Sequence, residues 1–243
     1  MRQVRYRAIA DELRRRVEAG EFGAGRLLPS ESELSGAYEA SRVTVRKALE
    51  LLRDEGLIDA RQGFGWFVAT DPVPQTLGRL GTIEDQLGAL GVESERRVVG
   101  FRFVAAPPRV RQVLDVESVL EVRRVNLADG EPFARVTVWC PEHLGATLSR
   151  AEVEKAPFYE LVGVPIGGAT QTIGAVAAGR ADATLLAVPV GSPMLRCERV
   201  TRDTGERPVL LSEFLFPAHR TEFVVDLPRV EPSIGPSGLR LVE

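Results

Sequence analysis

Residues that commonly build metal centres and redox sites are scarce in this 243-residue chain, which contains two cysteines and two histidines. Cys140 and Cys197 each stand alone in an apolar segment. We expect both to be buried free thiols, although two cysteines could also form one disulfide. With His143 and His219 as the only histidines, no metal-ligand cluster is visible. The sequence therefore predicts neither a metal site nor a cofactor.

Long apolar runs are missing as well. A membrane-spanning helix needs about 18 or more consecutive apolar residues, and no segment of this chain approaches that length. The first residues, Met1–Arg5, lead straight into a polar helix and do not form a signal peptide. We therefore expect a cytoplasmic protein that has no membrane partner.

The chain carries little net charge, −3 in total. Residues 1–70 hold 12 basic and 11 acidic residues, a balance of +1, and the remaining 19 basic and 23 acidic residues give −4. This balance excludes a protein that is basic over its whole surface. A basic surface can exist only as a local patch, and Arg42, Arg46, Lys47 and Arg61 are spaced to form one.

A helix-turn-helix pattern lies within residues 1–70, after a first amphipathic helix. Ser30 and Glu33 form a capping box, which predicts a helix that ends near Ala37. Ser41 is placed to cap the next helix, whose apolar residues recur at spacings of three and four and form a core face. The first turns of this helix present basic and hydroxyl side chains on its other face.

A hairpin follows the second of these helices. Gly56 is placed to end the helix in a left-handed cap. The segments Ile58–Arg61 and Trp66–Ala69 then pair across a glycine-containing turn. Two helices, a tight connection and a β-hairpin make a winged helix-turn-helix, a fold that binds DNA.

The chain is predicted to have two domains. The proline-stiffened segment Thr70–Pro74 reads as an extended linker. We assign residues 1–70 to the DNA-binding domain, 71–77 to the linker and 78–243 to a second domain. Strands outnumber helices in the second domain and are joined mainly by hairpins. This pattern predicts an α+β fold on an antiparallel sheet, in which we find no internal repeat.

Several motifs occur in an order and at spacings typical of one family. They are Leu28–Glu31, Ser41–Leu49, Glu55–Ile58 and Gln62–Val68 in the first domain, and Val122–Val125, Ala128–Pro132, Pro141 and Leu185–Leu195 in the second. On these motifs the chain resembles GntR-family transcriptional regulators of the HutC subfamily. The resemblance implies a winged helix-turn-helix followed by a UTRA effector domain with a chorismate-lyase-like fold.

The exposed face of the second helix is the predicted DNA contact. Arg42 and Arg46, one turn apart, can each reach guanine O6 and N7 or a phosphate, and the alternative is a solvated helix face. The resemblance implies that at least one of them reads a guanine. Ser32 stands where many relatives have a DNA-contacting arginine, so we expect that contact to be weakened or lost. The predicted DNA-binding residues are Ser30, Ser41, Arg42, Thr44, Arg46, Lys47, Arg61, Gln62 and Gly63.

The effector site is predicted mainly from the resemblance. The family's Arg-x-Arg pair falls on Arg124 and Asn126, and Arg124 is the best anion anchor, the alternative being an ion pair across the sheet. Val136, Pro157 and Thr221 replace polar residues of the sugar-phosphate binders, so we expect a less polar effector with at most one anionic end. The predicted effector-binding residues are Arg124, Asn126, Thr82, Tyr159, Val136, Glu213 and Thr221.

Together these features predict a sequence-specific DNA-binding regulator, most simply a metabolite-responsive repressor. One recognition helix per chain implies a homodimer on a pseudo-palindromic operator, with the signal passing through Asp71–Gln75. Two alternatives remain open: a DNA-binding dimer without an effector, and a lyase-like enzyme fused to a DNA-binding domain. The sequence shows no nucleophile–base pair, metal cluster or phosphate loop, which disfavours the enzyme.

Overall fold

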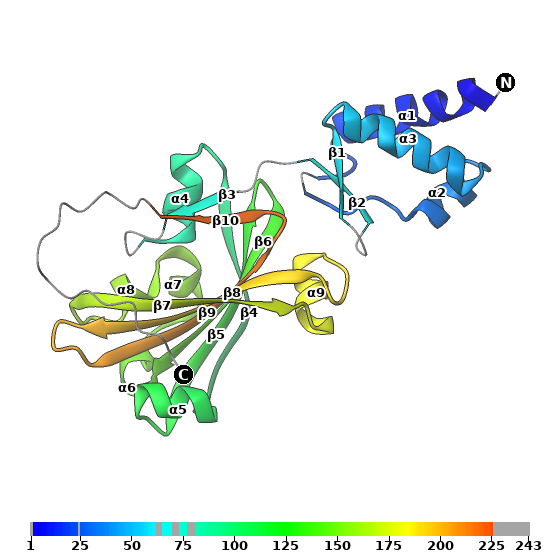
Figure 1. Ribbon diagram of the computed structural model, residues 1–243. Helices are drawn as coiled ribbons and strands as arrows, with labels where there is room; N and C mark the ends of the chain where they lie inside the picture. The colour runs from blue at the N-terminus through cyan, green and yellow to red at the C-terminus, as the bar shows by residue number, and fades with distance from the viewer. Residues whose placement is uncertain (1, 24, 62–64, 70–72, 77–80, 226–243) are drawn as a thin grey trace, which may run out of the picture.

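The computed structural model describes residues 2–23, 25–61, 65–69, 73–76 and 81–225. Its N-terminal part is the expected winged helix-turn-helix (Figure 1). The elements are α1 (Arg2–Glu18), α2 (Glu31–Ala37), α3 (Arg42–Asp54), β1 (Ile58–Arg61) and β2 (Gly65–Val68). The two strands pair antiparallel, and three helices with one hairpin enclose a separate small core.

The ends of α2 and α3 follow from side-chain caps. The Ser30 hydroxyl accepts from the Glu33 amide, and the Glu33 carboxylate accepts from the Ser30 amide, which is the predicted capping box. Ser41 caps α3 by accepting from the amide of Thr44. Gly56 follows the last turn of α3 with φ +77°, a conformation that glycine adopts without strain. The predicted caps and ends of α2 and α3 are confirmed.

The segment between the two domains is itself part of a sheet. Strand β3 (Val73–Thr76) pairs in parallel with β10 (Thr221–Val224), a strand near the end of the described chain. The sequence predicted that this segment is extended but gave no partner for it. The connection to the DNA-binding domain is therefore hydrogen-bonded to the effector domain along four residue pairs.

A six-stranded antiparallel sheet dominates the second domain (Figure 1). In spatial order its strands are β4 (Ser94–Ala105), β5 (Ser118–Ala128), β6 (Glu131–Pro141), β9 (Pro208–Pro217), β8 (Pro193–Asp203) and β7 (Ile166–Ala177). Helices α4 (Ile83–Ala89), α7 (Arg150–Lys155) and α8 (Phe158–Leu161) pack on one face. Helices α5 (Pro108–Leu114) and α9 (Arg180–Leu186) pack on the other, and α6 (Glu142–Gly145) follows β6.

This sheet contains an internal repeat that the sequence analysis missed. The order β4–α5–β5–β6 recurs as β7–α9–β8–β9. Both repeat helices end on a left-handed residue, Asp115 at φ 53° and Ala187 at φ 52°. The strand order reads the same from either edge, so an approximate twofold axis passes between β6 and β9. We place it at Thr137–Glu213, the central one of the five residue pairs that join these strands. Few residues are identical between the halves, so only the structure reveals the repeat.

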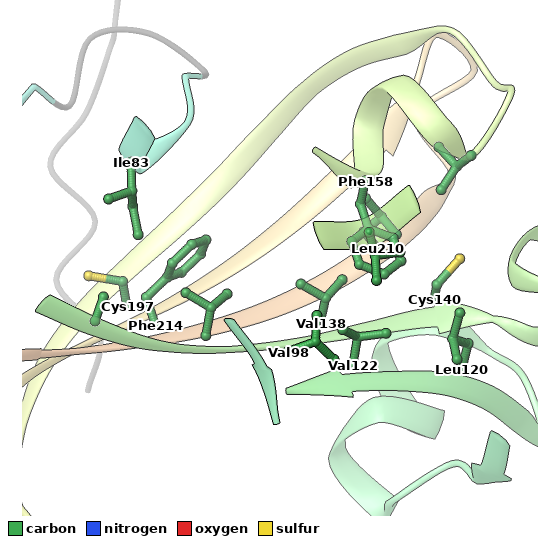
Figure 2. Packing of buried hydrophobic residues seen from close by; sticks show 14 of the residues in the cluster. Ile83, Val98, Leu120, Val122, Val138, Cys140, Phe158, Cys197, Leu210 and Phe214 are labelled. Carbon is green, nitrogen blue, oxygen red and sulfur yellow. The ribbon is translucent and has the colours of Figure 1, made fainter. Parts of the chain in front are cut away.

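The largest core lies between the sheet and α4, α7 and α8. Figure 2 shows Ile83 of α4 directed toward Cys197 and Phe214 on the sheet, with Phe158 above Leu210. Both cysteines are buried free thiols, as predicted. Burial raises the pKa of each thiol to about 12, so neither ionises at neutral pH. Among the described helices, none has the length and apolar character needed to cross a membrane.

Candidate nucleic-acid interface and effector cavity

In the first turn of α3, the side chains of Arg42 and Thr44 each contact a serine. Arg42 donates from Nη2 to the Ser32 hydroxyl at 3.0 Å. The Thr44 hydroxyl lies 2.8 Å from that of Ser41, the capping residue. Ser32 therefore acts here as a support for Arg42.

Arg46 is held in a defined position by α2. Its Nε and Nη2 donate to the two carboxylate oxygens of Glu31 at 2.9 and 2.7 Å. Glu31 also accepts from Nε1 of Trp66 at 3.2 Å. The ion pair raises the pKa of Arg46 and lowers that of Glu31. The Arg46 side chain nevertheless remains 60% exposed, so it is positioned by the protein and open to a second partner.

Val43 is a surface residue that the sequence analysis did not select. Its side chain is 68% exposed between Arg42 and Thr44, although valine is apolar. An exposed apolar residue at the start of a recognition helix is suited to contact a thymine methyl group in the major groove. The signal in the sequence was its place in the first helical turn, next to predicted base-contacting residues.

The remaining predicted DNA-binding residues are placed unevenly. Lys47 is exposed on α3, and Ser30 lies exposed at the start of α2. Arg61 is the last residue of β1. Gln62 and Gly63 lie outside the described residues.

A cavity of about 60 Å³ lies between the large sheet and helices α4 and α8. It is lined by Gly81, Thr82, Ile83, Gln86, Arg124, Val138, Pro157, Phe158, Tyr159, Gln171, Cys197, Arg199, Thr201, Leu210, Ser212, Phe214, Phe216 and Phe223. Strand β10 contributes Phe223, so the partner of the linker strand also borders this cavity. The lining is mainly apolar, and its described members include two arginines and no carboxylate.

Arg124 is the more deeply buried of the two arginines in this cavity. The residue is only 7% exposed, and its Nε and Nη1 atoms are buried without a hydrogen-bond partner. Burial lowers its pKa to about 10, so the guanidinium stays charged at neutral pH. It forms no salt bridge with any carboxylate of the described chain. The ion pair across the sheet that the sequence left open is therefore not seen here.

A second polar cluster adjoins Arg124. Oε1 of Glu84 accepts from Nε of Arg96 at 2.6 Å and from Nδ2 of Asn126. Burial raises the pKa of Glu84, but the Arg96 bond and the nearby positive charges outweigh this and lower it overall. Oε2 of Glu84 and Oδ1 of Asn126 are buried without partners. Asn126 thus binds Glu84 rather than standing free beside Arg124.

The other predicted effector residues separate into two groups. Thr82, which caps α4, and Tyr159 line the cavity with Arg124. Val136 is fully buried in the adjoining core, and Thr221 has a buried hydroxyl without a partner, but neither lines the cavity. Strand alternation places Glu213 on the opposite face from its lining neighbours Ser212 and Phe214, where it pairs with Arg135 at 2.8 Å.

Arg199 is the cavity residue that sequence reasoning missed. Its guanidinium lies over the Phe214 ring, 4.9 Å from the ring centroid. Nε donates to Gln171 at 2.8 Å and Nη1 to the carbonyl of Gly81 at 3.3 Å. Burial lowers its pKa. No local signal singled it out, because the dipeptide Arg-Val that it shares with Arg124 occurs eight times in the chain.

The DNA-binding and effector domains touch near the wing. Arg26 pairs with Glu131 at 2.7 Å. The His219 ring lies 4.8 Å from that of Phe67 on β2, and its Nε2 is 3.0 Å from the carbonyl of Gly25. His219 lies between β9 and β10, so the segment beside the cavity strands also contacts the wing.

Comparison with known proteins agrees with both halves of the chain. The family described as bacterial regulatory proteins, gntR family, matches residues 5–68, and the UTRA domain matches residues 89–222. The Mycobacterium tuberculosis helix-turn-helix-type transcriptional regulator Rv0792c is 33% identical over 93% of this chain and 87% of its own length. A probable fructoselysine utilization operon transcriptional repressor of Escherichia coli K12 is 27% identical over 92% and 95%.

A solved structure shares the fold. The crystal structure of PhnF from Mycobacterium smegmatis covers 91% of this chain and 100% of its own, with a TM-score of 0.60 and 25% sequence identity. The Mycobacterium tuberculosis and Escherichia coli relatives are named as transcriptional regulators and not as enzymes.

Proposed function

The chain belongs to the GntR family of bacterial regulatory proteins, with a UTRA domain behind its winged helix-turn-helix, and we propose that it is a dimeric repressor released by a small anionic effector. The observation that carries the effector class is Arg124, a buried guanidinium with two unpartnered nitrogens in a cavity. A buried charge without a partner destabilises a protein. An anionic ligand would supply the missing partner.

For the DNA-binding half, we propose that α3 enters the major groove with its first turns against the bases. Arg42, hydrogen-bonded to Ser32, and Arg46, paired with Glu31, are already oriented on the α3 surface in the free protein. Fixed side chains lose less conformational freedom on binding. Each is expected to donate to a guanine or to a phosphate, and Val43 to contact a thymine methyl.

The remaining proposed DNA contacts are to the backbone. Ser30, Ser41, Thr44, Lys47 and Arg61 have the hydroxyl or cationic groups that bind phosphates. Because one chain offers one recognition helix, specific binding needs two chains on two half-sites, roughly ten base pairs apart. We assign the dimer contact to the effector domain, as residues 78–243, and the DNA contact to residues 1–70.

The size of the cavity suggests how the signal is transmitted. The enclosed space of about 60 Å³ is small beside the roughly 300–1,000 Å³ of metabolite sites. We propose that an effector displaces part of the cavity wall. Helix α4, the next described element after β3, contributes Ile83 and Gln86 to that wall, and Phe223 of β10 borders the same cavity. Movement of either element shifts β3, and with it the spacing of the two recognition helices.

The test uses full-length protein and a duplex selected from a randomised library. Sedimentation should show two chains per duplex, and the selected sequence should contain two inverted half-sites. One chain per duplex, or selection of no common sequence, would contradict the proposal. A second measurement uses spin labels on the two α3 helices of the dimer. It compares the distance between them in the presence and absence of a ligand that releases the protein from DNA. Unchanged spacing would exclude the transmission step alone.

A further inference from the structure

The internal repeat places the two cavity arginines at equivalent positions. Arg124 on β5 pairs in register with Val136 on β6, and Arg199 on β8 pairs with Ser212 on β9. The approximate twofold axis between β6 and β9 exchanges these pairs. The same operation exchanges the edge partners Val98 on β4 and Gln171 on β7. A twofold axis perpendicular to a sheet keeps side chains on the same face, and both arginines do line one cavity.

Neither arginine has an acidic partner. Arg124 lacks a salt bridge to the described chain, and the described contacts of Arg199 are an amide, a carbonyl and an aromatic ring. The charge of Glu84 raises the pKa of Arg124 against the larger effect of burial, but the hydrogen bonds of Glu84 go to Arg96 and Asn126. Charges in a partly dry cavity are stable only when they are balanced. Two positive charges therefore call for two negative ones.

The strands that carry the two arginines lie apart, and apolar side chains line the cavity between them. Strands β5 and β8 are three positions apart in the sheet, which corresponds to about 14 Å between their backbones. The strands between them present Val138, Leu210 and Phe214 to the cavity. The Arg199 guanidinium lies over Phe214 of β9, the strand next to its own on the side toward β5. A ligand that spans the two needs acidic groups at both ends and an apolar middle.

We propose that Arg199 is a second effector anchor and that the effector is a small diacid with carboxylates at opposite ends of an apolar or aromatic body. This inference rests on the proposed function and replaces the single anionic end expected from the sequence. A guanidinium presents two parallel donors to a carboxylate, so each end is held by a bidentate contact. Stacking on Phe214 orients the guanidinium plane of Arg199 for the carboxylate at its end of the ligand.

The experiment measures binding by calorimetry and thermal shift with full-length protein. The diacid probes are succinate, adipate, suberate and terephthalate. Their monoacid counterparts are hexanoate, octanoate and benzoate. Glucosamine 6-phosphate is added as a ligand with both negative charges on one phosphate group. We expect one diacid to bind about tenfold or more tighter than its monoacid. Arg199→Met should abolish that preference, Arg199→Lys should retain part of it, and Arg124→Met should abolish binding of diacid and monoacid alike.

Arg202→Met is the matched control, because Arg202 lies on the same strand, outside the cavity lining, and bonds Thr170. Equal binding of monoacids and diacids, a preference that survives in Arg199→Met, tightest binding by glucosamine 6-phosphate, or no response to any probe would each overturn the inference. Binding to the selected duplex is recorded in parallel. Specific DNA binding without diacid preference overturns only the second anchor, whereas loss of specific DNA binding contradicts the proposed function itself.

Discussion

The arginines of the two domains differ in solvent exposure and in the partners that they contact. On the DNA-binding face Arg46 is exposed and already paired with Glu31, and Arg42 rests on a serine. In the effector cavity Arg124 is buried and unpaired, and Arg199 is half-buried and stacked on a ring. An exposed ion pair can open at little cost when a phosphate or base arrives. A buried guanidinium without a salt bridge instead leaves the free domain less stable, and in our proposal an anionic effector supplies the missing partner.

The largest expected effect comes from removing the buried charge. Arg124→Met should abolish the response to any anionic effector and should also raise the free energy of unfolding by about 1–3 kcal/mol, because unpartnered buried donors disappear. Urea unfolding and calorimetry measure the two effects. Arg123→Met, a change at the exposed neighbour on the same strand, serves as the control. A destabilised Arg124→Met would show that the arginine stabilises the fold.

On the DNA-binding side the same type of change should act on affinity and leave stability nearly unchanged. Arg46→Ala is expected to weaken operator binding by about 1–3 kcal/mol and relax discrimination at one base pair. Arg61→Ala should weaken binding without relaxing discrimination, as expected for a phosphate contact. Titrations against single-base operator variants separate the two results. Arg53→Ala, at the far end of α3 and paired with Asp54, is the control. Unchanged binding after both Arg42→Ala and Arg46→Ala would refute the assignment of α3.

A smaller effect is expected at Val43. Burying one methyl group is worth about 0.8 kcal/mol. Replacing thymine by uracil at the contacted position should therefore weaken wild-type binding a few-fold and leave Val43→Ala unaffected. A uracil scan across each half-site, by fluorescence anisotropy, locates the position. Equal sensitivity of both proteins at every position would exclude the contact.

The smallest effect concerns acid stability. Hydrogen bonding to Arg46 lowers the pKa of Glu31 below its ordinary value of 4.5. A carboxyl group with a depressed pKa in the folded state contributes stability above its unfolded pKa, and this contribution is lost as the pH falls. Between about pH 5 and 3, the wild type should therefore lose more unfolding free energy than Glu31→Gln does. Parallel curves for the two proteins would mean that the pair adds nothing in solution.

Local chemistry made the DNA-binding domain predictable from sequence. The capping box at Ser30, the cap at Ser41 and the left-handed Gly56 act over a few residues, so their spacing alone fixes where helices begin and end. The hairpins of the second domain were likewise predicted from short turn signals. The winged helix-turn-helix and the antiparallel sheet were both correct.

What the sequence could not supply depends on distant pairing. Strand β3 finds β10 near the end of the described chain, and nothing local to either strand indicates the other. Arg199 shares a cavity with Arg124 only because the repeat brings β5 and β8 onto one surface. Glu213 looked suitable by position, but the alternation of β9 turns it to the other face.

The β3–β10 pairing also defines where this protein can be divided. A designer who wishes to attach the effector domain to another DNA-binding module would ordinarily cut at the end of the linker. That cut would remove a strand which β10 pairs with in four positions. An effector domain that is to be moved to another protein should therefore begin before Val73, and the DNA-binding domain that is exchanged should end after β2.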